Sequence, residues 1–209
     1  MITPIETEYA GYKFRSRLEA RWAYFFDCLD IRYEYEREGY HIGQKWYLPD
    51  FWLPDLRYWI EVKPAVISDY GTLLCPPDGK LVYELQSVNG GQGFILAGAP
   101  GYYRSPYGAL ELEYQAFPAY DTDYLWCVCP DCRSLGLEFE GRSDRLPCKR
   151  NGCPTHDSNH DRTHTYTDRE ILGALNLAKQ ARFEHGDRVV GRQGRITGRY
   201  VMDASRLPY

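Results

Sequence analysis

Hydrophobic and polar residues alternate with two different periods at the start of the chain. Between Ser16 and Leu29, apolar residues recur at helical spacing, with Leu18, Trp22 and Phe25 at i, i+4 and i+7. This pattern predicts an amphipathic helix over 16–29. From Ile31 to Glu36 the period is two, which predicts a strand with one solvated face.

A β-hairpin is predicted next, because two apolar runs, Trp46 to Leu53 and Tyr58 to Val62, flank the segment Pro54-Asp55-Leu56-Arg57. The other elements expected in this half are a helix from Asp78 to about Val88 and strands at Gly93–Ala97 and Ala109–Tyr114. Together these elements indicate an α/β domain.

Charged residues occupy unusual positions in the hairpin. Asp50 interrupts the first apolar run, and Glu61 and Lys63 bracket Val62 at the end of the second. Because side chains alternate across a strand, Glu61 and Lys63 point to the same face. Charges on an apolar strand are costly unless they are paired or bind something. Asp50 on the neighbouring strand lies within reach, since facing residues in a hairpin have Cβ atoms about 5 Å apart.

Two carboxylates and a lysine at this separation suit a divalent cation. Magnesium binds through one or two protein carboxylates, retains several waters and completes its shell with phosphate oxygens. The ion lowers the pKa of a bound water and screens charge on a phosphate under attack. Lys63 would orient that water or stabilise the same charge. The alternative is a surface hairpin on which Asp50, Glu61 and Lys63 form solvated ion pairs.

Pro49-Asp50, followed after ten residues by Glu61-Val62-Lys63, resembles the signature of the PD-(D/E)XK nuclease superfamily. The resemblance covers about the first half of the chain. It implies a restriction-endonuclease-like αβββαβ core, in which a mixed central sheet is flanked by helices. Such enzymes often carry a glutamate on the first core helix that faces the metal, and Glu19 matches that position.

The resemblance implies a metal-dependent endonuclease that hydrolyses phosphodiester bonds, with DNA as the favoured nucleic acid. Asp50 and Glu61 would hold Mg²⁺ (or Mn²⁺) together with the Val62 carbonyl. Glu19 would assist directly or through water, and Lys63 would act on the attacking water, so Glu19, Asp50, Glu61 and Lys63 are the expected catalytic residues. The alternative is a non-catalytic zinc-ribbon protein that binds nucleic acid on the same scaffold.

The overall charge of the chain does not by itself indicate a nucleic-acid-binding protein. The formal net charge is −4, so nucleic-acid binding would depend on basic residues that cluster locally. No apolar run reaches membrane-spanning length, and the N-terminal residues do not have the layout of a signal peptide. We therefore expect a cytoplasmic protein with no membrane partner.

A cluster of cysteines indicates a second metal site. Five of the seven cysteines lie between residues 127 and 153, which in a reducing compartment favours metal over disulfides. Two short-spaced pairs predict a tetrahedral structural zinc site, formed by Cys129, Cys132, Cys148 and Cys153. Trp126 and Leu135–Phe139 would supply the strands of a zinc ribbon. Cys127 could replace Cys129, and His156, His160 or His164 could also substitute as ligands; the alternative is a set of unrelated buried cysteines.

A second amphipathic helix is predicted from Thr167 to Phe183, where Thr167 and Glu170 form a capping box. Its apolar stripe packs either on the core or across a homodimer; the stripe consists of Ile171, Leu172, Leu175 and Ala178. The expected domains are a nuclease core at 1–120, a zinc-ribbon-like module at 121–165, and a helix with a basic tail at 166–209.

Arginines are the expected contacts to phosphate groups. Arg188, Arg192 and Arg195 belong to the glycine-rich tail, which is alternatively a solvated segment. Arg17 and Arg21 lie one helical turn apart on the first helix, where structural ion pairs are the alternative.

Overall fold

A seven-stranded mixed sheet runs through the computed structural model, which describes residues 4–119, 123–142, 146, 153 and 165–183. The strand order is β15-β14-β13-β10-β7-β6-β3. At the centre, β7 (Tyr58–Lys63) pairs in parallel with β10 (Gln92–Ala97), and the other neighbours are antiparallel. The other strands are β3 (Glu34–Tyr35), β6 (Phe51–Leu53), β13 (Gln115–Phe117), β14 (Tyr124–Val128) and β15 (Leu135–Phe139). The fold is therefore mixed α/β.

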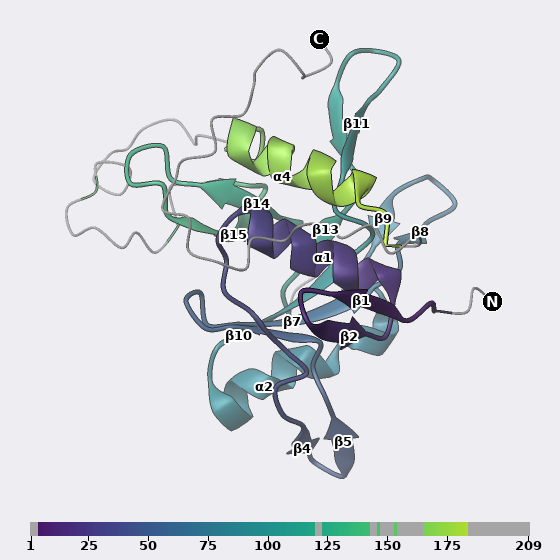
Figure 1. Ribbon diagram of the computed structural model, residues 1–209, viewed down its shortest axis with the longest axis vertical. Helices are drawn as coiled ribbons and strands as arrows, with labels where there is room; N and C mark the ends of the chain where they lie inside the picture. The colour runs from purple at the N-terminus through teal and green to yellow at the C-terminus, as the bar shows by residue number, and fades with distance from the viewer. Residues whose placement is uncertain (1–3, 120–122, 143–145, 147–152, 154–164, 184–209) are drawn as a thin grey trace.

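Helices cover both faces of this sheet (Figure 1). On one face α1 (Arg17–Cys28) and α4 (Arg169–Gln180) lie side by side, and on the other lies α2 (Leu81–Asn89), which follows the short 3-10 helix η1 (Pro77–Gly79). None of the described helices combines the length and the apolar character that a membrane crossing requires.

The alternation of side chains along β7 divides the interior into two hydrophobic clusters. Ile60 and Val62 belong to the cluster on the α1 side, whereas Trp59 packs with Val82 and Leu85 on the α2 side. Each fully buried side chain of this size contributes about 1.5–3 kcal/mol by leaving water. Because β7 is fixed from both faces, the residues at its end have well-defined positions.

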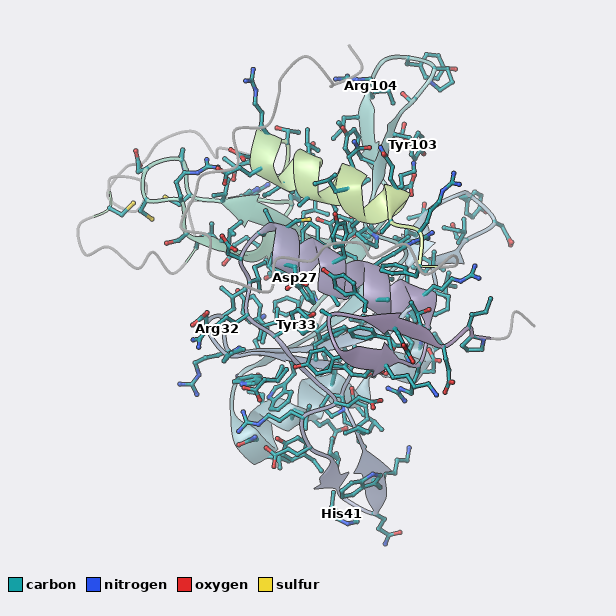
Figure 2. The ribbon with its side chains drawn as sticks, in the orientation of Figure 1. Asp27, Arg32, Tyr33, His41, Tyr103 and Arg104 are labelled. Carbon is teal, nitrogen blue, oxygen red and sulfur yellow. The ribbon has the colours of Figure 1, made fainter. Side chains whose placement is uncertain are left out.

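Within the described residues, four separate two-stranded hairpins surround the sheet. They are β1 (Thr7–Tyr9) with β2 (Tyr12–Phe14), β4 (Tyr40–Ile42) with β5 (Lys45–Tyr47), β8 (Val66–Ile67) with β9 (Leu73–Leu74), and β11 (Tyr102–Arg104) with β12 (Leu110–Leu112). Figure 2 shows His41 on the β4–β5 hairpin at one end of the molecule and Arg104 at the other. His41 is exposed and packs on the Trp46 ring at 5.0 Å between centroids.

The predicted hairpin forms between β6 and β7, with Phe51 opposite Ile60 and Leu53 opposite Tyr58. One expectation was wrong, because the first apolar run is not a single strand. It breaks at Leu48-Pro49-Asp50, and the residues before the break, Lys45–Tyr47, pair with β4 instead. Pro49 explains the break, since proline has no N–H to donate to a strand partner.

The C-terminal helix begins one residue later than predicted. Asp168, and not Thr167, is the N-cap, and its carboxylate accepts a hydrogen bond from the Glu170 N–H at 2.9 Å. Both residue types are good N-caps, so sequence alone discriminates poorly between adjacent candidates. The apolar stripe of α4 packs into the main core against α1, which is the first of the two predicted locations, core or homodimer interface.

The two strands expected for a zinc ribbon, now β14 and β15, continue the central sheet. Trp126 on β14 is fully buried and packs on Phe25 and Phe26 of α1, with ring centroids 5.7 and 5.9 Å apart. The cysteine-bearing segment therefore extends from the same core that supports the charged residues.

Candidate functional site

The charged residues of the hairpin converge at the carboxyl end of β7. Asp50 directly precedes β6, and its Oδ2 accepts a hydrogen bond from the Val62 N–H at 2.7 Å. Glu61 and Lys63 lie on one face of β7, as predicted, with 2.7 Å between Lys63 Nζ and Glu61 Oε1. Asp50 and Glu61 are only 3 % and 5 % exposed. This is a buried cluster and not a solvated hairpin surface.

The surroundings of Asp50 shift the pKa of its carboxyl. Burial raises the pKa of its carboxyl well above the ordinary value, and the nearby charges of Glu61 and Glu19 raise it further. The Val62 N–H and the Arg15 guanidinium oppose this rise but do not cancel it. The ionised form of Asp50 is therefore incompletely stabilised by its protein partners, and a bound cation would stabilise it further.

Lys63 shows the complementary effect. Burial by itself lowers the pKa of its ammonium group, but the negative charge of Glu61 and a hydrogen bond to it outweigh burial, and the pKa rises. Asp50 and Asp78 act in the same direction. Lys63 is therefore a cation in this arrangement, suited to stabilise negative charge or to orient a water molecule.

Glu19 is buried near this cluster, and its carboxylate caps the N-terminus of α1. Its Oε1 accepts a hydrogen bond from Ser16 Oγ at 2.6 Å, and the Ser16 side chain accepts one from the Glu19 N–H. Its Oε2 accepts from Tyr35 Oη at 2.7 Å and from the Arg15 N–H at 3.2 Å. These contacts form a variant of the capping box. Glu19 is close enough to raise the pKa of Asp50.

Three residues that the sequence did not indicate complete the cluster. Tyr47 donates a hydrogen bond to Glu61 Oε2 at 2.5 Å, and burial together with that carboxylate raises the pKa of its hydroxyl. Arg15 contacts Asp50 Oδ1 through Nη2 at 2.5 Å. Tyr35 donates to Glu19, as described above. The available signal was position, since Tyr47 lies three residues before Asp50 and Arg15 four before Glu19.

The fit to a divalent ion is partial. Each carboxylate oxygen of Glu19, Asp50 and Glu61 has a protein donor. The three carboxylates do not bring one oxygen each within 4.8 Å of the others; among the described residues only a cysteine cluster meets that criterion. Asp50 and Glu61 supply the ligand type that magnesium prefers, and together with Glu19 the three buried carboxylates outnumber the two cations that contact them, Arg15 and Lys63. The contact observed for Val62 comes from its N–H, whereas the predicted metal contact was its carbonyl.

The structure describes only some of the predicted phosphate contacts. Arg17 and Arg21 are half-buried on α1, and Arg21 Nε is buried without a hydrogen-bond partner in the described part of the chain. The predicted contacts Arg188, Arg192 and Arg195 lie outside the described residues.

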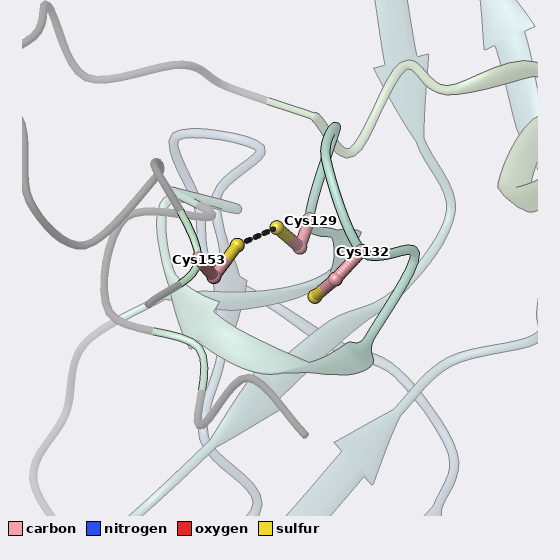
Figure 3. Close-up of side chains that lie close together, drawn as sticks. All are labelled: Cys129, Cys132 and Cys153. Atoms are coloured by element: carbon pink, nitrogen blue, oxygen red, sulfur yellow. Dashed lines mark hydrogen bonds between the residues drawn. The ribbon is translucent and has the colours of Figure 1, made fainter. Parts of the chain in front are cut away.

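A second cluster consists of Cys129, Cys132 and Cys153, whose Sγ atoms all lie within 4.8 Å of one another (Figure 3). The sulfurs of Cys129 and Cys153 are 3.5 Å apart, far beyond the disulfide bond length of about 2.05 Å. Tetrahedral zinc with Zn–S bonds of about 2.3 Å would place its sulfurs roughly 3.8 Å apart. These three cysteines can therefore hold a metal ion.

The turn that carries the first pair is well ordered by its own backbone. The Arg133 N–H donates to the Cys129 carbonyl at 3.0 Å, and the Cys129 N–H donates to the Ser134 carbonyl at 2.8 Å. The predicted fourth ligand, Cys148, and the substitute ligands His156, His160 and His164 lie outside the described residues. Cys127 is buried beside the cluster but is not one of the three converging cysteines.

No protein-family model, curated protein or solved structure matches this chain. The functional interpretation therefore depends on the chemistry and the geometry of its own residues.

Proposed function

We propose that this chain is a metal-dependent endonuclease of the PD-(D/E)XK type, which hydrolyses phosphodiester bonds in nucleic acid, with DNA as the favoured substrate. The observation that carries the proposal is the buried group of Asp50, Glu61 and Lys63 at the end of a strand that is fixed from both faces. A buried pair of carboxylates beside a lysine, with surplus negative charge, is typical of a catalytic cation site and unusual for a purely structural one.

Each residue has a specific task in this proposal. Asp50 and Glu61 hold Mg²⁺ (or Mn²⁺), with Glu19 assisting through a water molecule because its oxygens cap α1. The bound ion supplies an acidified water and charge stabilisation on the phosphate. Lys63 Nζ orients the attacking water, and Tyr47 fixes the Glu61 carboxylate through its 2.5 Å hydrogen bond. The water would lose a proton to solvent as its oxygen forms the new bond to phosphorus, while the P–O bond to the departing nucleotide breaks and the departing oxygen takes up a proton from solvent.

The arrangement of elements supports the same proposal. Around the central strands the chain runs α1, β3, β6, β7, α2, β10, which is the order that a restriction-endonuclease-like core implies. The parallel pair of β7 and β10 lies at the centre of the sheet.

For the cysteine cluster we propose a structural zinc ion, held by Cys129, Cys132 and Cys153, with Cys148 as the fourth ligand. Four thiolates leave no coordination position for a substrate. The task of this ion is therefore to fix the turn after β14 and the segment that leads to α4.

Cleavage assays on a panel of substrates test the endonuclease proposal. The purified protein is incubated with Mg²⁺ and linear, supercoiled, single-stranded and branched DNA, and with RNA. We expect Asp50→Asn and Glu61→Gln each to reduce cleavage by roughly 10²–10³-fold or more. Asp55→Asn is the matched control, because Asp55 lies on the same hairpin and pairs with Arg32 at the surface.

Two results would contradict the proposal. Cleavage that survives both Asp50→Asn and Glu61→Gln would exclude this site. Nucleic-acid binding without Mg²⁺-dependent cleavage of any substrate would indicate the non-catalytic zinc-ribbon alternative instead.

A further inference from the structure

Arg15 occupies a position that the proposed chemistry does not explain. It directly precedes the N-cap of α1, and its guanidinium lies between two carboxylates from different segments. Nη2 is 2.5 Å from Asp50 Oδ1, and Nε is 2.6 Å from Glu36 Oε1. The Arg15 N–H donates to Tyr35 Oη at 3.0 Å and to Glu19 at 3.2 Å, so its backbone is fixed while its side chain remains 54 % exposed.

We propose that Arg15 is a cation latch, which pairs with Asp50 before metal binds and releases it when a divalent ion takes its place. The proposal rests on the proposed function, because it assigns the metal to Asp50. It adds a residue that sets metal affinity without belonging to the ligand set.

The contacts of Asp50 make the two cations mutually exclusive at one atom. Asp50 Oδ2 accepts the Val62 N–H, which belongs to a buried strand and cannot move away. Oδ1 is therefore the atom available to a metal ion, and in this structure it contacts the Arg15 guanidinium. A divalent ion that binds Oδ1 must displace a full positive charge.

Release from Asp50 does not leave the guanidinium without a partner, because a second carboxylate is already in place. Glu36 remains within ion-pair distance of Nε, so Arg15 does not lose all compensation when it leaves Asp50. The side chain also borders solvent, where an unpaired guanidinium is well hydrated. Lys63 cannot perform the same role, since its partner in this structure is Glu61 and its side chain is only 22 % exposed.

The latch resolves a conflict in the metal-free protein. Asp50 is 3 % exposed and lies beside two other buried carboxylates, an arrangement that is strongly unfavourable without a cation. Arg15 supplies that cation during folding. The cost is a lower affinity for the metal, because each binding event must break the Arg15–Asp50 pair.

Metal titration of the zinc-loaded full chain tests the latch without any activity assay. Mn²⁺ is titrated calorimetrically into wild-type protein, Arg15→Met and Arg15→Lys. We expect Arg15→Met to bind Mn²⁺ roughly tenfold more tightly, the size of one partly screened charge contact. Arg15→Lys should fall between the two, because it retains the charge but not the fork geometry. Arg32→Met is the matched control, since it removes an arginine from the surface pair with Asp55.

Thermal unfolding provides a second readout if Arg15→Met is difficult to handle at calorimetric concentrations. Without Mn²⁺, Arg15→Met should melt below wild type; with Mn²⁺, its midpoint should rise by more than that of wild type. Asp50→Asn should abolish the Mn²⁺ response in either background.

Two outcomes would contradict different parts of the argument. Equal Mn²⁺ affinity in wild type, Arg15→Met and Arg32→Met, with binding still lost in Asp50→Asn, overturns the latch and leaves the proposed function standing. A wild-type Mn²⁺ response that Asp50→Asn does not change overturns the metal site and, with it, both proposals.

Discussion

The two clusters of potential metal ligands differ in the strength of the hydrogen bonds that the protein makes to the ligand atoms. At the end of β7, the carboxylate oxygens receive strong donors from the protein itself, among them Arg15, Tyr47 and the Val62 N–H. In the cysteine cluster, the sulfurs of Cys129 and Cys153 face each other at 3.5 Å. A thiol is a weak donor and a weak acceptor, so this contact stabilises little.

The difference indicates what each cluster requires for folding. The carboxylate cluster is internally paired, so the surrounding core can form without a divalent ion, and the proposed metal binding would be an exchange of partners. The cysteine cluster gathers groups that would gain most from a metal, so the proposed zinc ion would be part of the folded state. The two proposals together place a hard, exchangeable ion and a soft, permanent ion in one chain.

The clusters are also linked through α4. The Val128 N–H donates to Thr165 Oγ1 at 3.1 Å, which ties β14 to the segment before α4. Helix α4 packs on α1, and α1 carries Glu19. Loss of order around the cysteines should therefore reach the carboxylate cluster, whereas the loss of a single hydrogen bond among the carboxylates leaves α1 and α4 packed and should not disturb the cysteines.

Removal of the metal from the cysteine cluster is expected to have the largest effect. Cys129→Ser should abolish stoichiometric zinc and destabilise the protein by several kcal/mol, since structural zinc contributes directly to folding. The measurements are bound zinc by elemental analysis and the midpoint of thermal unfolding. Cys28→Ser on α1 is the control and should retain zinc. A Cys129→Ser protein with an unchanged midpoint would show that no ion supports the fold there.

Tyr47→Phe is expected to have the next largest effect, now at the carboxylate cluster. It removes a hydrogen bond to a buried charged group, which should cost about 1.5–3 kcal/mol in the free energy of unfolding. Urea denaturation measures this, and bound zinc should not change. Tyr12→Phe is the control, because Tyr12 is exposed on β2. If Tyr47→Phe released zinc, the proposed one-way dependence between the clusters would be wrong.

Asp50→Asn should change stability in the opposite direction. It removes a buried charge whose carboxyl has a raised pKa, and with it the repulsion from Glu61 and Glu19. We expect the metal-free protein to gain on the order of 1 kcal/mol, as is common when a functional residue is replaced. Urea denaturation in Mg²⁺-free buffer measures this change in stability. EDTA is not added, because it would also remove zinc. A loss of stability would show that Asp50 is a structural residue whose pairing with Arg15 outweighs its burial.

Much of the first half of the fold could be predicted from periodicity, for identifiable reasons. The helix predicted over 16–29 forms over Arg17–Cys28, because Trp22 and Phe25 on its apolar face are fully buried. The placement of Glu61 and Lys63 on one face, where they form an ion pair, followed from strand alternation. Prediction failed where a local competitor decided the outcome, as at Pro49, which ended a strand, and at Asp168, which capped a helix in place of Thr167.

Tyr47 and Arg15 could not be predicted as members of the site, because only the tertiary fold brings them to the carboxylates. Tyr47 reaches Glu61 only because the β4–β5 hairpin folds separately from β6. Arg15 reaches Asp50 across thirty-five positions of sequence. Neither contact has a period or a motif. The convergence of Cys129, Cys132 and Cys153 could be predicted from the sequence, because short-spaced cysteine pairs form a recognisable motif.

Arg133→Ala is expected to have the smallest effect and tests the link between the cysteine turn and α4. Arg133 contacts both Asp168 oxygens, at 2.9 and 3.0 Å, and Glu170 at 2.8 Å. Burial alone would raise the pKa of Asp168, but the hydrogen bonds and charge of Arg133, together with the N–H groups of Glu170 and Ile171, outweigh it and lower the pKa. Because Arg133 is 42 % exposed, solvent screens the pair, and its loss should cost about 0.5–1 kcal/mol.

Salt dependence identifies the origin of that cost. Urea denaturation of wild type and Arg133→Ala at 0.1 M and about 1 M NaCl should give a stability difference that shrinks as ions screen the pair. Arg32→Ala is the control, because the ion pair between Arg32 and Asp55 does not connect the cysteine turn to a helix. A salt-independent difference of several kcal/mol, accompanied by zinc loss, would mean that Arg133 holds the metal turn itself, and the two clusters would then depend on α4 more than on zinc.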